Sequence, residues 1–587
     1  MLAWWRPGLR LACLLPCVVL GGCQAIASHF VLPQHGVRPP EFAVRVSHNV
    51  PMNTADGVVL LSEIYRPVGV SIVPTILVRL PYSKSLKNDT GTAVVARFWA
   101  ARGYVVVIQA SRGRHGSGGE FYPLRDERRD GVETLEWLAR QPWYDGRLGM
   151  WGGSAFGYTQ WALSDQREPR VSAFMIQIAS SHFHDMFYSG GAFSLESALY
   201  WAVRSRGSED VTPSRQTLDR GEYGFPLIEA DDRAVGDIGF FNDWASHPQR
   251  DAYWESIDGK RRARDLQAPA LLMAGWSDPF LPSQLSDFET VRAEADPRVA
   301  AASRLIIGPW THANTIQFPD GPQPGAYRPA SLAPSISWFD QLLMGHPVDP
   351  TLVAPVRIFV MGENVWRDEQ EWPLARARPT KLYFHSAGHA NTSTGDGRLS
   401  PDPPSDEEVA DSFVYNPENP VPTSGGAMLG SAAGMRAQND IEARADVLVY
   451  STEPLANDLE VTGPLTATLR VQTTAANTDF TAKLVDVCPS GKAYNVSDGI
   501  LRRAYPLSSE QGTAPQEITV ELWPTSMLFR RGHRIRVEIS SSNFPRYDRN
   551  TNSGRDLATD TLPIAATQRV RHTQTYPSYL VLPVIPR

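Results

Sequence analysis

A serine, an aspartate and a histidine follow one another along this sequence in positions that suit nucleophilic catalysis. Ser154 lies within Gly152–Gly157, where small residues allow the backbone to turn sharply from a strand into a helix. A serine hydroxyl becomes a strong nucleophile only when a base removes its proton and a carboxylate orients that base. Asp278 and His312 each follow an apolar run typical of a buried strand. We therefore predict that Ser154 is a nucleophile, His312 its base and Asp278 the partner of the histidine.

Each of these three residues also has a simpler interpretation. The usual serine turn has its second glycine two residues after the serine, but here Phe156 stands there and the glycine comes one residue later, so the motif alone also fits an ordinary turn. Asp278 precedes a proline and could cap a helix, and His312 is one of 13 histidines. The agreement of all three with the chain order Ser, Asp, His favours the catalytic interpretation.

Two groups are candidates for stabilising negative charge beside Ser154. A tetrahedral intermediate needs hydrogen-bond donors directed at its oxygen anion. The backbone N–H of Ala155, the residue after the serine, is one expected donor. The second usually comes from the loop after the third strand, which contains Tyr82. Pro81 has no N–H to offer, whereas the Tyr82 hydroxyl is a candidate donor; the alternative is a tyrosine that only packs.

Strands and helices that would position these residues alternate along two parts of the chain, 41–180 and 265–349. Helical patterns lie between apolar runs, as in the parallel sheet of a doubly wound α/β domain with helices on both faces. The predicted strands lie at 74–82, 104–109, 171–179, 269–278 and 304–312, and the predicted helices at 92–101, 125–141 and 281–295.

Two further regions break this alternation. Residues 181–264 are rich in aromatic and charged residues without a clear strand, which predicts a helical insertion over the carboxyl edge of the sheet. From residue 350 to 587, short alternating runs separated by turn residues predict an all-β sandwich, beginning with a strand at Val356–Val360.

Composition narrows the function classes. The chain has 587 residues, a net charge of −7 and no basic block, so nucleic acid is not an expected partner. The body of the chain holds a single cysteine, Cys488, so we expect neither an internal disulfide nor a cysteine cluster for zinc. We predict no metal and no cofactor, and leave open whether the chain forms homo-oligomers.

The first residues have the pattern of an export signal. Basic residues precede a short apolar stretch that is too short to span a bilayer comfortably. It ends in Leu20–Cys23, which resembles a bacterial lipobox, so Cys23 is a candidate for lipidation; a plain cleaved signal is the alternative. We predict a signal peptide at 1–23, a tether at 24–40 and an exported protein, periplasmic or held at the outer membrane of a bacterium by a lipid anchor.

Several motifs together resemble the cocaine esterase / X-Pro dipeptidyl-peptidase family of serine hydrolases, from about residue 40 to the end. They are Arg79–Tyr82, Gly103–Gln109, Ser111–Gly113, Ser117–Phe121, Gly149–Ser154, Gly157–Trp161, Gly275–Asp278 and Ile307–His312. The family uses the serine turn whose glycine lies three residues after the serine, as Gly157 does. Ala110 and Pro279 depart from the family pattern.

This resemblance implies an α/β-hydrolase domain at 41–180 and 265–349, a helical cap at 181–264 and a C-terminal jelly-roll sandwich at 350–587. It implies that Ser154, His312 and Asp278 form the catalytic triad. It also implies that Tyr82 and Ala155 form the oxyanion hole and that Phe280 lies in the acyl pocket.

Three functions remain to be compared. The first is a serine hydrolase that cleaves a small ester or amide through an acyl-enzyme. The second is an X-Pro dipeptidyl-peptidase, which needs an acidic group to hold the ammonium of its peptide; Asp185, Glu196 and Glu209 of the cap are candidates. The third is a non-catalytic envelope protein that binds ligands, which we disfavour because no member of the predicted triad is missing.

Overall fold

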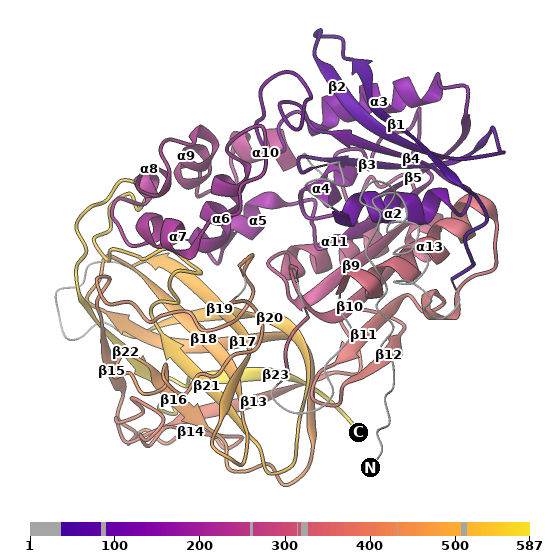
Figure 1. Cartoon of the computed structure of the whole chain (residues 1–587). Coiled ribbons are helices and arrows are strands. Elements are labelled where there is room, and N and C mark those ends of the chain that lie inside the picture. Colours follow the sequence, from indigo (N-terminus) through magenta and orange to yellow (C-terminus); the bar gives the residue numbers. More distant parts are fainter. Residues whose placement is uncertain are drawn as a thin grey trace, which may run out of the picture.

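The computed structural model describes residues 37–83, 90–258, 262–313, 315–318, 327–430, 432–505 and 514–587. The predicted signal peptide, the candidate lipidation site Cys23 and most of the predicted tether lie outside these residues. Within them, a sheet covered by helices, a group of cap helices and a region of strands form three parts (Figure 1). No helix in the described ranges combines the length and apolar character needed to cross a bilayer.

The first sheet carries the predicted catalytic residues. Its ten described strands lie in the order β1-β2-β4-β3-β5-β6-β9-β10-β11-β12, and the neighbours from β4 to β11 run parallel. The central strands are buried almost throughout because their apolar runs face helices on both sides. The strands are β1 (Val44–Asn53), β2 (Val59–Pro67), β3 (Val73–Leu80), β4 (Val105–Ala110), β5 (Tyr144–Gly153), β6 (Ala173–Gln177), β9 (Ala270–Ser277), β10 (Arg304–Thr311), β11 (Val356–Val360) and β12 (Val365–Glu369).

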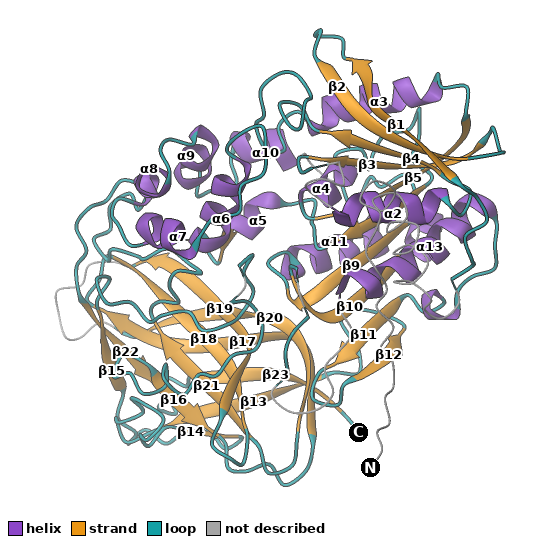
Figure 2. Cartoon of the chain, viewed as in Figure 1, coloured by secondary structure: helices purple, strands orange, loops and turns teal. Residues whose placement is uncertain are grey.

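Helices cover both faces of this sheet, as the α/β pattern predicts (Figure 2). Successive strand side chains point to opposite faces, so Leu77 packs with one helix layer and Val78 with the other. One layer is α2 (Thr90–Ala100) and α13 (Tyr327–Met344); the other contains α3 (Glu127–Ala139), α4 (Ala155–Trp161), α11 (Leu281–Glu294) and α12 (Pro297–Ala302).

The insertion after β6 is mainly helical, and its core is aromatic. Trp201 and Trp244 stack with their ring centroids 5.2 Å apart, and Phe187 packs beside them. A short hairpin, which the sequence analysis does not predict, lies between the first two helices. The elements are α5 (Phe183–Phe187), β7 (Tyr188–Ser189), β8 (Ala192–Phe193), α6 (Leu195–Ser205), α7 (Arg215–Glu222), η1 (Leu227–Glu229), α8 (Ala230–Ala234), α9 (Gly239–Ser246) and α10 (Ala252–Asp258).

The C-terminal part is all-β, as predicted, and its first strand is β13 (Arg378–His385); the short turn η2 (Pro350–Leu352) and strands β11 and β12 come before it in the chain. Its described strands form one eleven-stranded, largely antiparallel sheet that folds around an apolar core (Figure 1). They are β13 (Arg378–His385), β14 (Arg398–Ser400), β15 (Asp411–Tyr415), β16 (Leu448–Ser451), β17 (Leu459–Thr473), β18 (Asn477–Val487), β19 (Ala493–Ala504), β20 (Gln516–Phe529), β21 (Arg534–Ser540), β22 (Ala566–Arg571) and β23 (Tyr579–Ile585).

One strand lies in a different sheet from the one predicted. Val356–Val360, expected to open the all-β region, pairs in parallel with β10 and antiparallel with β12. The sheet of the first domain therefore runs to Glu369, beyond the expected boundary at 350. The prediction for this strand is wrong because its alternating pattern fits either sheet, and only packing against β10 decides between them.

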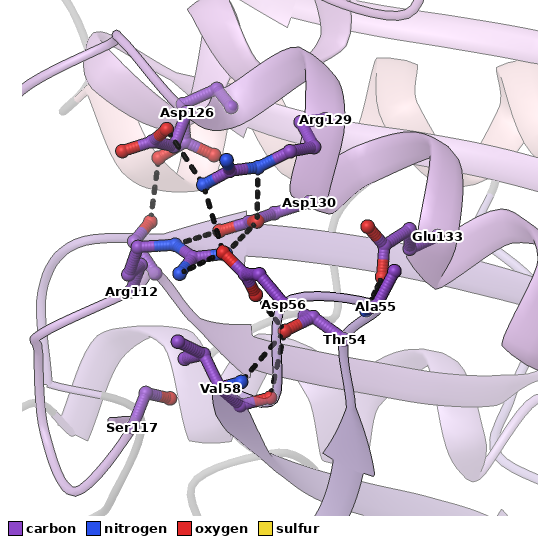
Figure 3. Close-up of polar contacts among 12 residues, drawn as sticks. Thr54, Ala55, Asp56, Val58, Arg112, Ser117, Asp126, Arg129, Asp130 and Glu133 are labelled. Atoms are coloured by element: carbon purple, nitrogen blue, oxygen red, sulfur yellow. Dashed lines mark hydrogen bonds and ion pairs between the residues drawn. The ribbon is translucent and has the colours of Figure 1, made fainter. Parts of the chain in front are cut away.

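An ion-pair cluster fixes the loop that follows β4 (Figure 3). The Arg112 guanidinium makes two contacts with Asp130 of α3, at 3.1 and 2.6 Å, and a third with Asp56 of the β1–β2 turn, at 2.9 Å. Asp130 is buried, while Arg129 beside it is half exposed. Arg112 thus ties an edge turn of the sheet to α3.

We expect Arg112→Leu to lower the free energy of unfolding by about 3 kcal/mol, because it leaves the Asp130 carboxylate buried without its main partner. The control is Arg129→Leu, which removes a half-exposed guanidinium from the same cluster and should cost less than about 1 kcal/mol. Urea denaturation of both variants measures the difference. Equal decreases in the free energy of unfolding would contradict the expectation that the ion pair with the buried Asp130 stabilises the fold more than the half-exposed one does.

Candidate active site

The turn around Ser154 joins β5 to α4, and its backbone adopts an unusual conformation. Ser154 has φ 58° and ψ −132°, a region that non-glycine residues rarely adopt. Its N–H is held by the carbonyls of Gln177 and Ile178, at 3.1 and 3.2 Å. A Cβ at Gly157 would lie 2.5 Å from the Cβ of Ala179. A glycine at this position therefore lets α4 pack directly against the segment after β6.

Ser154, His312 and Asp278 meet at the carboxyl edge of the sheet. Asp278 and His312 directly follow the neighbouring parallel strands β9 and β10, so both side chains reach the same edge. His312 Nε2 lies 2.9 Å from Ser154 Oγ, and His312 Nδ1 lies 2.6 Å from Asp278 Oδ2. The other carboxylate oxygen of Asp278 accepts the N–H of Phe280 at 2.8 Å, and Asp278 is fully buried. This chain of hydrogen bonds is able to move a proton from the serine to the imidazole.

Ala155 follows the serine in the chain, and Tyr82 lines the same cavity as the serine. Ala155 is the first residue of α4, where backbone N–H groups have no acceptor within the helix. Tyr82 follows β3 and lines the same cavity as Ser154, and its hydroxyl interacts with the serine side chain. Burial raises the pKa of the Tyr82 hydroxyl, so the group stays protonated at neutral pH and is able to donate.

A cavity of about 280 Å³ opens in front of Ser154. Phe280 forms part of its wall, with its ring centroid 5.1 Å from that of Phe183 and 5.8 Å from that of His312. Residues of α2, the cap, α13 and the all-β domain complete the wall. The lining residues are Tyr82, Gly91, Thr92, Val95, Trp151, Gly153, Ser154, Phe156, Gln177, Ile178, Phe183, Met186, Tyr200, Trp201, Arg204, Phe280, His312, Ala313, Ser331, Leu332 and Leu429.

A buried arginine that the sequence analysis does not identify holds two parts of this wall together. Arg114 donates to the carbonyl of Pro81, next to Tyr82, at 2.7 Å. It also donates to the carbonyl of Ser205 at the end of α6, at 3.2 Å, and to Asp210 at 2.5 Å. Arg114 therefore fixes the Tyr82 loop relative to the cap helix. Its position in a glycine-rich loop gives no periodic signal from which this role could be inferred.

The three acidic candidates of the cap all lie outside the cavity wall. Glu196 is buried and accepts the N–H of Gly430 at 3.0 Å, an arrangement that joins the cap to the all-β domain. Burial raises the pKa of the Glu196 carboxyl. Asp185 lies 3.1 Å from His184, and Glu209 lies 3.0 Å from His115. The described lining residues include no aspartate or glutamate.

A group of possible metal ligands lies elsewhere, in the all-β domain. Asp486, Cys488 and His533 bring their ligand atoms within 4.8 Å of one another, and His533 Nδ1 is 2.9 Å from Asp486. None of the three lines the cavity beside Ser154. The sequence analysis does not predict this cluster because its members come from two separate parts of the chain.

A buried carboxyl anchors the start of the cap. Asp287 of α11 accepts both the N–H and the hydroxyl of Ser181, at 2.8 and 2.6 Å. Burial raises the pKa of the Asp287 carboxyl to about 7, whereas an unfolded aspartate has a pKa of about 4. Between these values the unfolded chain releases a proton that the folded chain keeps, so stability falls as the pH rises and then levels off above about 7.

We expect Asp287→Asn to remove this decline. The difference in unfolding free energy between variant and parent should shift in favour of the variant by on the order of 4 kcal/mol between pH 4 and pH 8. Denaturant titrations at several pH values give the difference, in which the other titrating groups cancel. Asp232→Asn, at an exposed position of the cap, is the control. A difference that does not change with pH would contradict the prediction.

Comparison with known proteins places the chain in a family. Residues 56–314 match the X-Pro dipeptidyl-peptidase (S15 family), and residues 351–581 match the X-Pro dipeptidyl-peptidase C-terminal non-catalytic domain. The cocaine esterase of Rhodococcus sp. (strain MB1 Bresler) is 37% identical over 576 residues, which cover 92% of this chain and 99% of the esterase. The chain belongs to the S15 family of serine hydrolases. The predicted family resemblance is thereby confirmed.

Solved structures of similar architecture match almost the whole length of this chain. An aminopeptidase from the marine sediment archaeon Thaumarchaeota archaeon superposes with a TM-score of 0.79 at 24% identity, covering 94% of this chain and 99% of the other. An α-amino acid ester hydrolase gives a TM-score of 0.75 at 23% identity, with the same two coverages. At these identities the similarity concerns the fold. It confirms the predicted α/β-hydrolase domain followed by an all-β domain.

Proposed function

We propose that this S15 hydrolase cleaves a small ester or acyl amide through an acyl-enzyme on Ser154, with His312 as base and Asp278 as its partner. The observation that carries the proposal is the hydrogen-bonded chain from Ser154 Oγ through His312 to the buried Asp278, at 2.9 and 2.6 Å. It lies in the wall of a cavity of about 280 Å³, a size suited to a small substrate.

In this mechanism, Ser154 Oγ attacks the carbonyl carbon of the substrate while its proton moves to His312 Nε2. The Ala155 N–H and the Tyr82 hydroxyl donate hydrogen bonds to the oxygen anion that forms. When the intermediate collapses, the leaving alcohol or amine takes the proton from His312, and the acyl group remains on Ser154. A water molecule, deprotonated by His312, then hydrolyses the acyl-enzyme and restores the serine.

Ester or acyl-amide cleavage is favoured over release of Xaa-Pro dipeptides. A dipeptidyl-peptidase has to hold the ammonium group of its substrate, and a carboxylate in the cavity would do this. The described lining residues provide an arginine and no acid. The 37% sequence identity with a cocaine esterase, over 99% of the length of that esterase, supports the same choice.

Labelling with a fluorophosphonate tests the proposal. This probe forms a covalent bond only with an activated serine. We expect the purified protein to be labelled on the peptide that contains Ser154 and the Ser154→Ala variant to remain unlabelled. Hydrolysis of neutral 4-nitrophenyl esters should exceed hydrolysis of Xaa-Pro anilides. Labelling of the variant, or a preference for the anilides, would overturn the respective part of the proposal.

We also propose that the protein is exported and anchored by a lipid on Cys23. The support is the Leu20–Cys23 motif at the end of a short apolar stretch. Metabolic labelling with a clickable fatty acid in a bacterial host should tag the parent and not a Cys23→Ser variant. Equal tagging of both would overturn the proposal.

A further inference from the structure

An arginine of the cap and the catalytic serine line the same cavity. Helix α6 contributes Tyr200, Trp201 and Arg204 to the cavity wall, since residues three and four apart share one face of a helix. The guanidinium carbon of Arg204 lies 5.2 Å from the ring centroid of Tyr82. Tyr82 and Ser154 line the same cavity, so Arg204 belongs to the wall that also holds the reacting serine.

Arg204 brings a positive charge into this wall. Among the described lining residues, Arg204 is the only arginine, lysine, aspartate or glutamate. The other ionisable side chains of the lining are the imidazole of His312 and the neutral tyrosines. No carboxylate of the described residues forms an ion pair with it. Asp210, whose charge interacts with that of Arg204, is instead held by Arg114 at 2.5 Å and by the Ser83 N–H at 3.1 Å.

The surroundings of Arg204 suit an anion supplied by a ligand. Aromatic rings of Trp201, Phe156 and Phe183 form much of the wall, which is therefore largely apolar. In such a medium a guanidinium binds a carboxylate through two parallel hydrogen bonds, which are stronger than in water. A substrate carboxylate would complete the pairing that the described residues do not provide.

We propose that Arg204 forms a subsite for a carboxylate of the substrate, so that the enzyme prefers anionic esters or acyl amides to neutral ones of the same size. The proposal rests on the proposed function, since it names the substrate class of the Ser154 site. The other possible role of Arg204 is to hold the Tyr82 ring by a cation–π contact. That role would affect neutral and anionic substrates equally, so the two are separable.

Two matched pairs of substrates test the proposal. The first pair places the charge on the acyl side: 4-nitrophenyl glutarate, a monoester with a free carboxylate, against 4-nitrophenyl pentanoate. The second pair places it on the leaving group: 3-acetoxybenzoate against its methyl ester. For each pair the measured quantity is the ratio of kcat/KM for the anionic substrate to kcat/KM for the neutral one.

In at least one pair, we expect this ratio to fall about tenfold or more in Arg204→Gln, with partial recovery in Arg204→Lys. The pair that responds tells which side of the scissile bond carries the charge. Arg206→Gln is the matched control, because Arg206 is exposed, lies two residues further along and does not line the cavity. Its ratio should stay within about twofold of the parent value.

An unchanged ratio in Arg204→Gln for both pairs would overturn the carboxylate subsite, even if both rates fell together. Glutarate should also slow fluorophosphonate labelling of Ser154 in the unmodified protein more than butanol of equal concentration does. This measurement needs no variant, so it tests the proposal even if Arg204→Gln fails to fold. Equal slowing of the labelling by glutarate and by butanol would count against the proposal. If the unmodified protein neither hydrolyses esters nor reacts with the fluorophosphonate, the result would instead contradict the proposed function.

Discussion

We expect Asp278→Asn to lower kcat by about 10⁴-fold while the protein remains folded. The reason is the direction of two hydrogen bonds. Asp278 Oδ1 accepts the N–H of Phe280 at 2.8 Å, and Oδ2 faces His312 Nδ1 at 2.6 Å. In the variant, the amide oxygen keeps the bond to Phe280, so the NH₂ group faces Nδ1. Nδ1 must then accept, which places the imidazole proton on Nε2.

A proton on Nε2 points at Ser154 Oγ, which lies 2.9 Å away. The imidazole is then unable to take the serine proton, so both acylation and deacylation slow. Steady-state kinetics with a 4-nitrophenyl ester give kcat, and thermal unfolding checks the fold. Asp265→Asn, at an exposed position before β9, serves as control and should retain parental activity. A decrease of less than tenfold in Asp278→Asn would falsify the assigned role of the carboxylate.

The second large effect is expected for Tyr82→Phe, which should lower kcat by about 10²- to 10³-fold. The variant keeps the ring, whose centroid is 6.1 Å from that of Phe156 in an edge-on contact, and removes only the hydroxyl. If this hydroxyl stabilises the oxygen anion, its loss affects the transition state and leaves ground-state binding almost unchanged. KM should therefore change little.

Kinetics with neutral esters separate kcat from KM for Tyr82→Phe. Tyr223→Phe removes a hydroxyl from an exposed cap tyrosine and is the control. Fluorophosphonate should still label Ser154 in Tyr82→Phe, though more slowly, because the nucleophile and its base are intact. A rise in KM with unchanged kcat would show that Tyr82 binds substrate and does not stabilise the anion.

The arrangement of Ser154, Asp278 and His312 could be predicted because strand ends determine it. Continuous apolar runs identify buried parallel strands, and the carboxyl ends of such strands meet at one edge of the sheet. A residue directly after a run is therefore positioned by local sequence alone. Gly157 was harder to interpret, since its role depends on contact with Ala179, which no local pattern reveals.

The cap side of the cavity could not be predicted in the same way. Arg114 and Arg204 belong to a loop and to a helix whose partners are distant in sequence, so no periodicity marks them. The sequence made Asp185, Glu196 and Glu209 equal candidates for holding a substrate ammonium. Their distances from the serine depend on how the cap helices pack, and Glu196 instead joins the cap to the all-β domain.

The position of β11 and β12 has a consequence for dividing this protein into parts. The family match divides the chain near 351, but the sheet of the first domain is completed by strands on the far side of that point. A chain ended at residue 350 would leave β10, a strand buried from Leu305 to Thr311, with an open edge. Unpaired apolar edges recruit other chains. Such a fragment should aggregate, whereas a fragment that extends through Glu369 keeps the edge of its sheet paired. A boundary at residue 350 therefore cuts through the first sheet and does not separate two independent domains.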